Sequence, residues 1–282
     1  NRGVAKFECK DFLGAVADFT KVIDKEPNAV VYVYRGHAKA ALNDLDNALN
    51  DYDNAKKIEP SYADAHYYIG VIKFQQEKYE DAIECFDIAV TLKPEYAYAY
   101  NDRGSAKRQL EQLDDAVADY LKAVELNPNM AFAYNNLGSV KKKQGQISDA
   151  LKYYSKAIEI KPDYYVAYNN RGSLKFDEGN FTEAIADFDE AIKINPEYAF
   201  AYNNRANAKF KLEMLNEALD DYSKAIAIEP DYGFAFMNRG IIKEMLRDDD
   251  GACNDWRKAA ALGVENAEVF VKDQCRKNWF LN

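Results

Sequence analysis

The sequence has 282 residues, of which 47 are acidic and 37 are basic, so its formal net charge at pH 7 is −10. This balance argues against nucleic acid or an anionic membrane surface as the main ligand, because both are bound through an excess of Lys and Arg. No stretch approaches the ~20 consecutive apolar residues that span a bilayer, so no membrane insertion is expected.

The prolines and glycines of the chain follow one register. Successive prolines recur with a nearly constant period of about 34 residues, which is typical of helical repeat arrays. A glycine precedes each of the first six prolines at one fixed offset, as Gly36 precedes Pro60. Ala206 replaces the glycine in the seventh repeat, and Gly240 opens an eighth. The prolines are Pro27, Pro60, Pro94, Pro128, Pro162, Pro196 and Pro230.

Two further positions complete the repeat. Counted from the glycine position, residue +12 is always alanine and residue +16 is always aromatic, as in Ala184 and Phe188. Small residues beside a large aromatic side chain allow two helices to pack closely. Each repeat is therefore predicted to be a pair of antiparallel helices, with the proline in the turn to the next pair.

In chain order, the predicted domain covers residues 1–263, and residues 264–282 form a capping helix (265–278) and a tail. Because the register places the opening Asn1-Arg2-Gly3 inside a helix, we expect a truncated first pair and a longer parent sequence. Eight pairs and the capping helix predict seventeen helices. The approximate repeats are 1–28, 29–62, 63–96, 97–130, 131–164, 165–198, 199–232 and 233–263.

This pattern resembles the tetratricopeptide repeat, in which an aromatic residue, Leu-Gly, Tyr, Ala, a second aromatic residue, Ala and Pro recur in the same order and with the same period. The resemblance extends to Leu262. It implies an all-α, right-handed superhelical solenoid of helix pairs whose first helices form a concave face. It also implies a protein-interaction scaffold with no enzymatic activity and no cofactor.

Two positions depart from that family. The residue before the glycine is arginine in six repeats, and the residue at +15 is aspartate in the same six. Both are missing in the third repeat (Ile69, Cys85) and in the fifth (Leu137, Tyr153). This joint loss predicts a salt bridge inside each repeat. A lysine at +3 occurs in all eight repeats, so we expect it to be independent of that pair, and solvated or paired with a carboxylate.

A row of polar residues precedes the glycines, two positions away. In family members asparagines at this place grip the backbone of an extended peptide, and a carboxamide suits that role because it both donates and accepts. Beside this row are further asparagines and aromatic residues; the alternative is that the amides only hydrate an empty face. The candidate groove residues are Asp102, Asn136, Asn170, Asn204, Asn238, Asn135, Asn169, Asn203, Tyr98, Phe132, Phe200 and Phe234.

Other constellations favour structural roles. His66 occupies an aromatic position of the repeat, and His37 has no partner at a recognisable catalytic spacing. The run from Asp248 to Gly251 lacks the alternate acidic positions of a calcium loop, so it predicts a polar turn and no metal site. The Lys and Arg clamp by which some tetratricopeptide proteins hold chaperone carboxylates is missing from the corresponding places.

The cysteines show no metal or redox motif. Cys9, Cys85, Cys253 and Cys275 form no Cys-x-x-Cys pair, so we expect free, mostly buried thiols, consistent with a reducing compartment such as the cytoplasm.

The predicted partner is a protein or peptide bound as an extended segment. Two alternatives remain: a regulatory or targeting arm of an enzyme whose catalytic domain lies before Asn1, or a self-assembling module that forms a homo-oligomer by docking Trp279-Phe280-Leu281 into a neighbouring copy.

Overall fold

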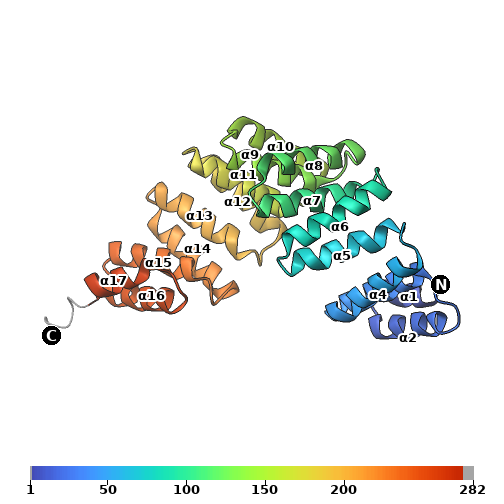
Figure 1. Cartoon of the computed structure of the whole chain (residues 1–282). Coiled ribbons are helices and arrows are strands. Elements are labelled where there is room, and N and C mark those ends of the chain that lie inside the picture. The colour runs from blue at the N-terminus through green and yellow to red at the C-terminus, as the bar shows by residue number, and fades with distance from the viewer. Residues whose placement is uncertain (1, 276–282) are drawn as a thin grey trace. The chain divides into compact units, whose positions relative to one another are not determined.

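The structure is a computed structural model that describes residues 2–275. This part of the chain holds seventeen α-helices and no strand, as the repeat pattern predicted (Figure 1). It forms two compact halves, an N-terminal half (Asn1–Val140) and a C-terminal half (Lys141–Asn282). The first nine helices are α1 (Arg2–Glu8), α2 (Phe12–Ile23), α3 (Ala29–Ala41), α4 (Leu45–Ile58), α5 (Ala63–Gln75), α6 (Tyr79–Leu92), α7 (Ala97–Gln109), α8 (Leu113–Leu126) and α9 (Ala131–Lys143), which ends just inside the C-terminal half. The others are α10 (Ile147–Ile160), α11 (Tyr165–Asp177), α12 (Phe181–Ile194), α13 (Ala199–Lys211), α14 (Leu215–Ile228), α15 (Gly233–Met245), α16 (Asp249–Ala261) and α17 (Ala267–Gln274).

The two helices of a repeat pack against each other where the repeat's aromatic side chain meets its glycine. A Cβ atom added to Gly36 would lie 2.5 Å from Cε1 of Tyr52, and one added to Gly172 would lie 2.8 Å from Cε1 of Phe188. Such distances are shorter than any van der Waals contact allows. Glycine therefore allows the ring to approach the first helix closely, and in the seventh repeat Ala206 takes its place in the cluster with Tyr222.

The turn inside each repeat contains one residue in the left-handed backbone region, seven positions after the glycine. Gly145 and Gly179 take this place in two repeats, with φ of 73° and 80°. In the other six repeats a residue with a side chain adopts the same conformation, which costs free energy that glycine avoids. These residues are Lys10, Asn43, Glu77, Glu111, Glu213 and Arg247.

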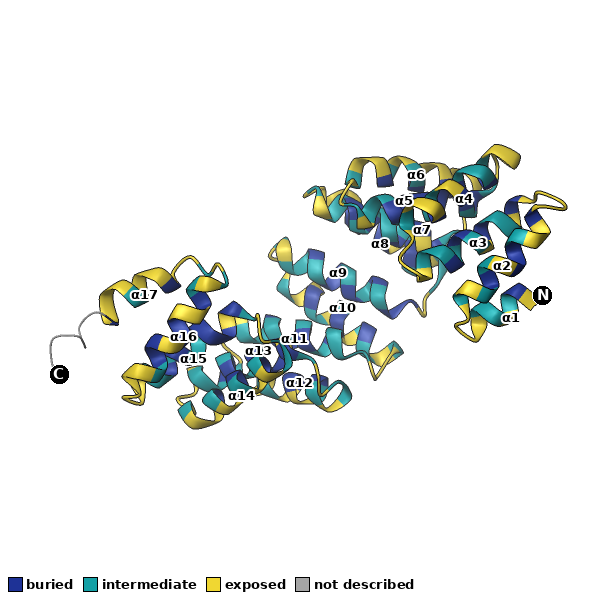
Figure 2. Ribbon diagram, turned by 90° about the horizontal axis from the view of Figure 1, so that it is seen from below, coloured by how far each residue is buried: buried dark blue, intermediate teal, exposed yellow. Residues whose placement is uncertain are grey.

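The core continues from each repeat into the next within each half. Tyr52 of α4 packs with Val33 of α3 and with Ile69 and Ile72 of α5, and in the C-terminal half Tyr222 packs with Ala199 and Ile242. Burial follows the faces where neighbouring helices meet, whereas the turns are exposed (Figure 2). Because each repeat buries its apolar face only against its neighbours, the array is stabilised by interfaces between successive repeats.

The C-terminal helix differs from the expectation in one respect. α17 packs on the last repeat as predicted, with Phe270 5.1 Å from Trp256 between ring centroids. However, Cys253 and Cys275 form a disulfide, Cys9 is exposed and Cys85 is only half-buried, so the prediction of four free and mostly buried thiols was wrong. The sequence hid the disulfide because its cysteines are 22 residues apart on different helices. The predicted tail Trp279-Phe280-Leu281 lies outside the described residues.

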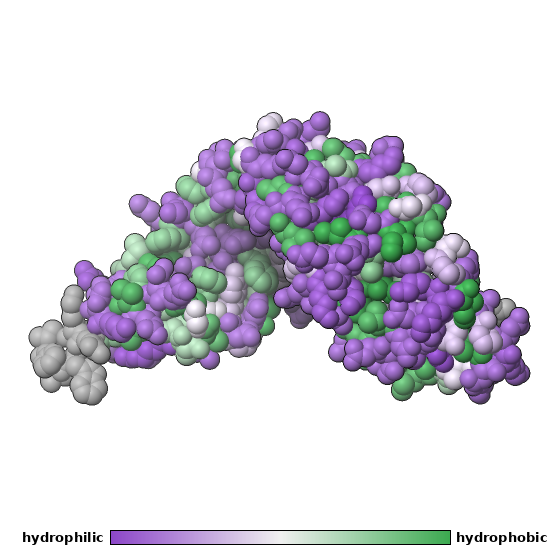
Figure 3. Space-filling view, viewed as in Figure 1, coloured by the Kyte–Doolittle hydropathy of each residue, from purple (hydrophilic) through white to green (hydrophobic). Residues whose placement is uncertain are grey.

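None of the helices described here combines the length and the apolar character needed to cross a membrane. The surface is mainly hydrophilic, with apolar side chains exposed among the polar ones (Figure 3).

Candidate functional site

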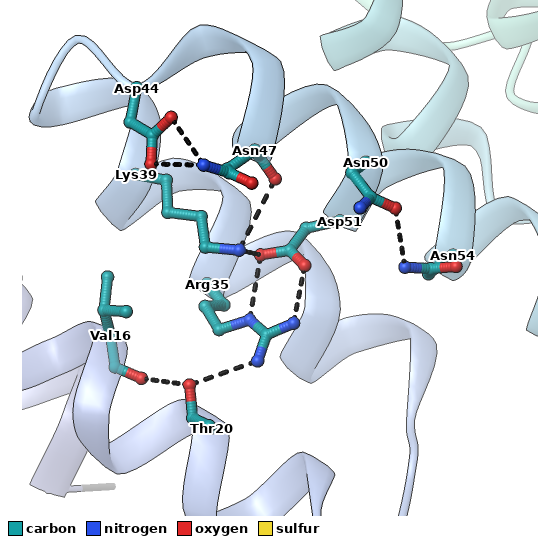
Figure 4. Close-up of polar contacts among 9 residues, drawn as sticks. All are labelled: Val16, Thr20, Arg35, Lys39, Asp44, Asn47, Asn50, Asp51 and Asn54. Atoms are coloured by element: carbon teal, nitrogen blue, oxygen red, sulfur yellow. Dashed lines mark hydrogen bonds and ion pairs between the residues drawn. The ribbon is translucent and has the colours of Figure 1, made fainter.

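The predicted salt bridge within each repeat is present. Arg35 of α3 donates from Nε and Nη2 to the two carboxylate oxygens of Asp51 on α4, at 2.9 and 2.7 Å (Figure 4). This two-pronged geometry is the strong form of an arginine–carboxylate pair. The same pairing joins Arg2–Asp18, Arg103–Asp119, Arg171–Asp187, Arg205–Asp221 and Arg239–Asp255.

The lysine row proves to be part of this network in six repeats. Lys39 Nζ lies 2.7 Å from Oδ2 of Asp51, so the aspartate is shared by two cations. Our expectation that the lysine is independent of the pair was therefore wrong. Where the aspartate is missing, Lys73 turns to Asp81 at 3.6 Å, and Lys141 donates to Gln146 at 2.7 Å. The other shared lysines are Lys6, Lys107, Lys175, Lys209 and Lys243.

Five of the six arginines, all except Arg2 of the first repeat, also reach the preceding repeat, which the sequence reasoning missed. Arg35 Nη1 donates to Oγ1 of Thr20 at 3.1 Å, and Arg103 Nη1 reaches Oδ1 of Asp87 at 2.6 Å. The acceptors lie at position +17 of the repeat, counted from the glycine. In the fourth repeat position +17 is Leu121, and the fifth repeat that follows has Leu137 in place of the arginine. The polar acceptor and the arginine are therefore both absent there. The arginines thus connect successive repeats, which is a structural role.

The candidate groove residues are arranged on the first helices as amide and aromatic pairs. Phe200 and Asn204 on α13, and Phe234 and Asn238 on α15, are four positions apart and so share a helix face. Phe200 is 45% and Phe234 63% exposed, while both asparagines are half-buried. In the N-terminal half, Tyr98 on α7 is 50% exposed and shares its face with Asp102.

The aromatic members also contact one another. The Tyr98 ring lies 5.9 Å from that of Phe132, which packs partly buried against Met130 and its neighbours. Phe200 lies 5.2 Å from the Tyr232 ring. These rings therefore cover part of the helix contacts as well as the exposed face.

The asparagines of the row hydrogen-bond to the repeat before them. Asn136 Nδ2 donates to Oδ1 of Asn101 at 3.1 Å, and Asn204 Nδ2 donates to Oδ1 of Asn169 at 3.0 Å. The acceptors are buried, as are Asn135 and Asn203 at the same position. This differs from the expected surface position of Asn135, Asn169 and Asn203, which are buried, and Asn169 accepts from the half-buried amide of Asn204.

These hydrogen bonds from the amide of one repeat to the preceding repeat form a ladder, and the ladder changes at its C-terminal end. Asn238 Nδ2 donates to Oδ1 of Asn207 at 3.2 Å rather than to Asn203. As a result, Oδ1 of Asn203 is buried without a hydrogen-bond partner among residues 2–275, although its Nδ2 donates to Asn204 at 3.4 Å. An unmade bond at a buried acceptor costs about 1–3 kcal/mol, which marks this end of the row as unsatisfied. Asn170 lies half-buried on α11, also on a first helix.

Asp102 takes the place of asparagine at the N-terminal end of the row. Its Oδ2 accepts from the Tyr67 hydroxyl at 2.7 Å and its Oδ1 from Nδ2 of Asn101 at 2.8 Å. Burial raises the pKa of Asp102, whereas both hydrogen bonds act in the opposite direction. The carboxylate lines a cavity of about 390 Å³ between α5, α6 and α7, together with Val71, Phe74 and Arg108.

An aromatic cluster lies on α3, α4 and α5. The His37 ring lies 4.1 Å from that of Tyr68, and its Nδ1 is 2.9 Å from the hydroxyl of Tyr52. Burial lowers the pKa of His37 to about 4. His66 is buried, and its Nε2 bonds the carbonyl of Pro60 at 3.0 Å. Both histidines therefore have structural partners that spacing alone did not reveal.

The acidic run forms the N-cap and first turn of α16, so the polar turn expected at Asp248–Gly251 is instead the start of a helix. Asp248 accepts a hydrogen bond from the backbone of Gly251 at 3.0 Å and caps the helix. Within the described part of the chain, no three His, Cys, Asp or Glu side chains are grouped so that they could hold a metal ion.

Comparison with protein families fits these helix pairs. A model described as TPR repeat matches residues 36–76, 104–145 and 172–213, and one described as Tetratricopeptide repeat matches 63–96, 131–164 and 199–232. The chain belongs to the tetratricopeptide repeat family. Tetratricopeptide proteins generally mediate protein–protein interactions. A search of curated proteins found no match to this chain.

Solved structures share the tetratricopeptide fold. The APC/C hetero-tetramer Cut9–Hcn1 is similar with a TM-score of 0.72 and 19% identity, over 93% of this chain and 52% of that one. Yeast Tom70 gives 0.64 and 21%, over 95% and 59%. YrrB, described as a TPR protein with an unusual peptide-binding site, gives 0.52 and 29%, over 65% and 95%. The chain thus spans about half the length of the Cut9 structure's chain.

Proposed function

We propose that this tetratricopeptide protein binds an extended segment of a partner protein along the exposed face of its first helices. The observation that carries the proposal is the pairing of Asn204 with Phe200 and of Asn238 with Phe234, four residues apart on α13 and α15. An amide can bond a backbone group of any sequence, and an exposed ring beside it can receive a side chain. The similarity to YrrB, whose description names a peptide-binding site, supports a peptide ligand.

The ladder assigns a specific role to each amide. One Nδ2 proton of Asn204 and one of Asn238 are used inside the protein. Each amide keeps its second Nδ2 proton and acceptor capacity on Oδ1 for a ligand. Because the internal bonds fix the amide orientation, less conformational entropy is lost when a segment binds.

The test uses peptides selected on the protein itself from a displayed library of random nine-residue sequences. Replacing Asn170, Asn204 and Asn238 together with alanine is expected to weaken the best peptide by roughly a hundredfold, at about 1 kcal/mol for each lost bond. The matched control replaces Asn47, Asn50 and Asn216, which are exposed on second helices, and is expected to keep the affinity. Equal affinities of the two triple variants, both folded by circular dichroism, would contradict the proposal.

A further inference from the structure

The charge of Asp102 is not required by the hydrogen-bond ladder. In later repeats an asparagine at this position bonds the preceding repeat, as Asn136 bonds Asn101. Asp102 makes the equivalent contact to Tyr67 with the direction reversed, because the tyrosine hydroxyl donates. A hydroxyl can also accept, so an asparagine at position 102 could donate to Tyr67 and still accept from Asn101. The carboxylate thus adds a negative charge that the fold does not need.

This charge, on a half-buried side chain, also lacks the compensation that the buried aspartates of the chain have. The six buried aspartates each bind an arginine and a lysine; Asp51, for example, binds Arg35 and Lys39. Asp102 has only two neutral donors, and the described residues offer it no ion pair. Burial raises its pKa, which reports the same uncompensated charge. An enclosed carboxylate of this kind gains free energy from any cation that reaches it.

The cavity beside Asp102 is large enough for a long side chain, and Gln75, Ser105 and Arg108 line it beside its apolar residues. Its volume of about 390 Å³ is at the small end of ligand pockets. Val71 and Phe74 of α5 and the fully buried Phe86 of α6 form an apolar wall. Lysine and arginine bury their aliphatic stems against such walls and extend their charged ends to a polar group.

Arg108 adds a second requirement. It lines the same cavity, yet within residues 2–275 it makes no ion pair with Asp102. An occupant therefore meets an anion and a separate cation. A basic residue within an extended segment satisfies both, because its side chain carries a positive charge and its main-chain carbonyl accepts from a guanidinium.

We propose that this cavity is a specificity pocket for one lysine or arginine side chain of the bound segment, with the cationic end at Asp102 and the aliphatic stem against Val71 and Phe74. The proposal rests on the proposed function for its ligand, an extended segment, and adds which side chain that segment must carry. It assigns recognition of a basic side chain to this pocket of the N-terminal half.

The first experiment does not depend on knowing the partner. N-acetyl-lysine N-methylamide is titrated into the isotope-labelled full chain, and its norleucine counterpart, which lacks the amine, is titrated in parallel. Amide resonances of Val71, Phe74 and Ser105 should shift, with lysine bound at least tenfold more tightly. Asp102→Asn should weaken the lysine probe about tenfold and leave norleucine unchanged. Glu80→Gln removes one negative charge at an exposed position of α6 and should change the affinity for neither probe.

A lysine preference below threefold, or a loss below threefold in Asp102→Asn, overturns the pocket. So does an equal loss of both probes, because a purely structural aspartate would affect them alike.

The second experiment separates this inference from the proposed function. The random nine-residue library is selected on the wild type and on Asp102→Asn. A lysine or arginine enriched at one fixed position on the wild type alone supports the pocket. Enriched peptides without such a position contradict the pocket and support the proposed function. If no peptide is enriched, the proposed function fails, and the lysine titration still decides the pocket.

Discussion

Replacing Asp51 gives the sharpest test of the arginine–aspartate–lysine network. The Asp51 side chain is 2% exposed and bonds Arg35 twice and Lys39 once. Asp51→Asn leaves two largely enclosed cations facing a neutral amide. Removing one partner of a buried ion pair costs about 3–5 kcal/mol, and because both cations keep some contact with water we expect about 3 kcal/mol.

The chain itself supplies the rescue. The fifth repeat uses Leu137 and Tyr153 at the positions of Arg35 and Asp51, with Leu121 at the position of Thr20. A variant with Arg35→Leu, Asp51→Tyr and Thr20→Leu copies this apolar solution and should cost less than about 1 kcal/mol, because well-packed apolar residues often replace a buried ion pair without loss.

Hydrogen exchange of the α3 and α4 amides is the suitable assay, since repeat arrays open locally and a single unfolding midpoint averages over repeats. The reasoning is refuted if Asp51→Asn costs less than about 1 kcal/mol, or if the triple variant is as unstable as Asp51→Asn.

Three further predictions concern the turns, the helix contacts and pH. Gly36→Ala should destabilise by about 1–3 kcal/mol and more than Gly104→Ala, whose added Cβ would meet Tyr120 at 3.1 Å instead of 2.5 Å from Tyr52; urea unfolding of both variants checks the order. Glu213→Gly should stabilise by about 1 kcal/mol because φ is 60° there, while Gly179→Ala at φ 80° should destabilise by a similar amount in the same assay. The pKa of His37 is lowered to about 4, so the unfolded chain binds a proton near pH 6.5 that the folded chain refuses. Stability should therefore fall by up to about 3 kcal/mol as pH decreases from 6.5 to 4, and His37→Gln should remove that share of the pH dependence of urea unfolding.

The helix pairs were predictable because the same residue pattern recurs in every repeat. Glycine, alanine and aromatic residues recur at fixed offsets, and the contact of Gly36 with Tyr52 is the physical reason for two of those positions. The arginine–aspartate pair was predictable because both residues disappear together in two repeats. Repetition thus acted as an internal comparison among eight copies.

Contacts that do not repeat were the ones missed. The bond between Cys253 and Cys275 occurs once, so no second copy revealed it. The direction of the amide ladder also escaped, because Asn136 and Asn204 are chemically able to bond a ligand, solvent or a neighbouring helix. Only the structure shows that the buried Asn101 and Asn169 each accept one proton from these amides, and that Asp102 lines a cavity with Val71, Phe74 and Phe86.

The effect of Asp102 on the free energy of unfolding gives a test that binding data cannot provide. Its folded-state pKa is raised above that of an unfolded chain, so the folded state binds a proton more tightly and stability decreases as pH rises through that interval. The groups that face it are Tyr67 on α5, Asn101 and Arg108 on α7, and Tyr120 on α8. At pH 7 the ionised carboxylate therefore destabilises the N-terminal half, and Asp102→Asn should stabilise it by roughly 1 kcal/mol, as substitutions at functional positions often do.

Asp119 on α8 is the matched control. It is also enclosed but is neutralised by Arg103 and Lys107, so Asp119→Asn should destabilise. Urea unfolding of both variants over a pH series measures the two signs, and the gain from Asp102→Asn should shrink as the pH falls and the wild-type carboxyl takes up its proton. If Asp102→Asn destabilises as Asp119→Asn does, the charge at position 102 serves the fold. Stabilisation combined with loss of lysine binding would mean that the chain retains this carboxylate for its ligand.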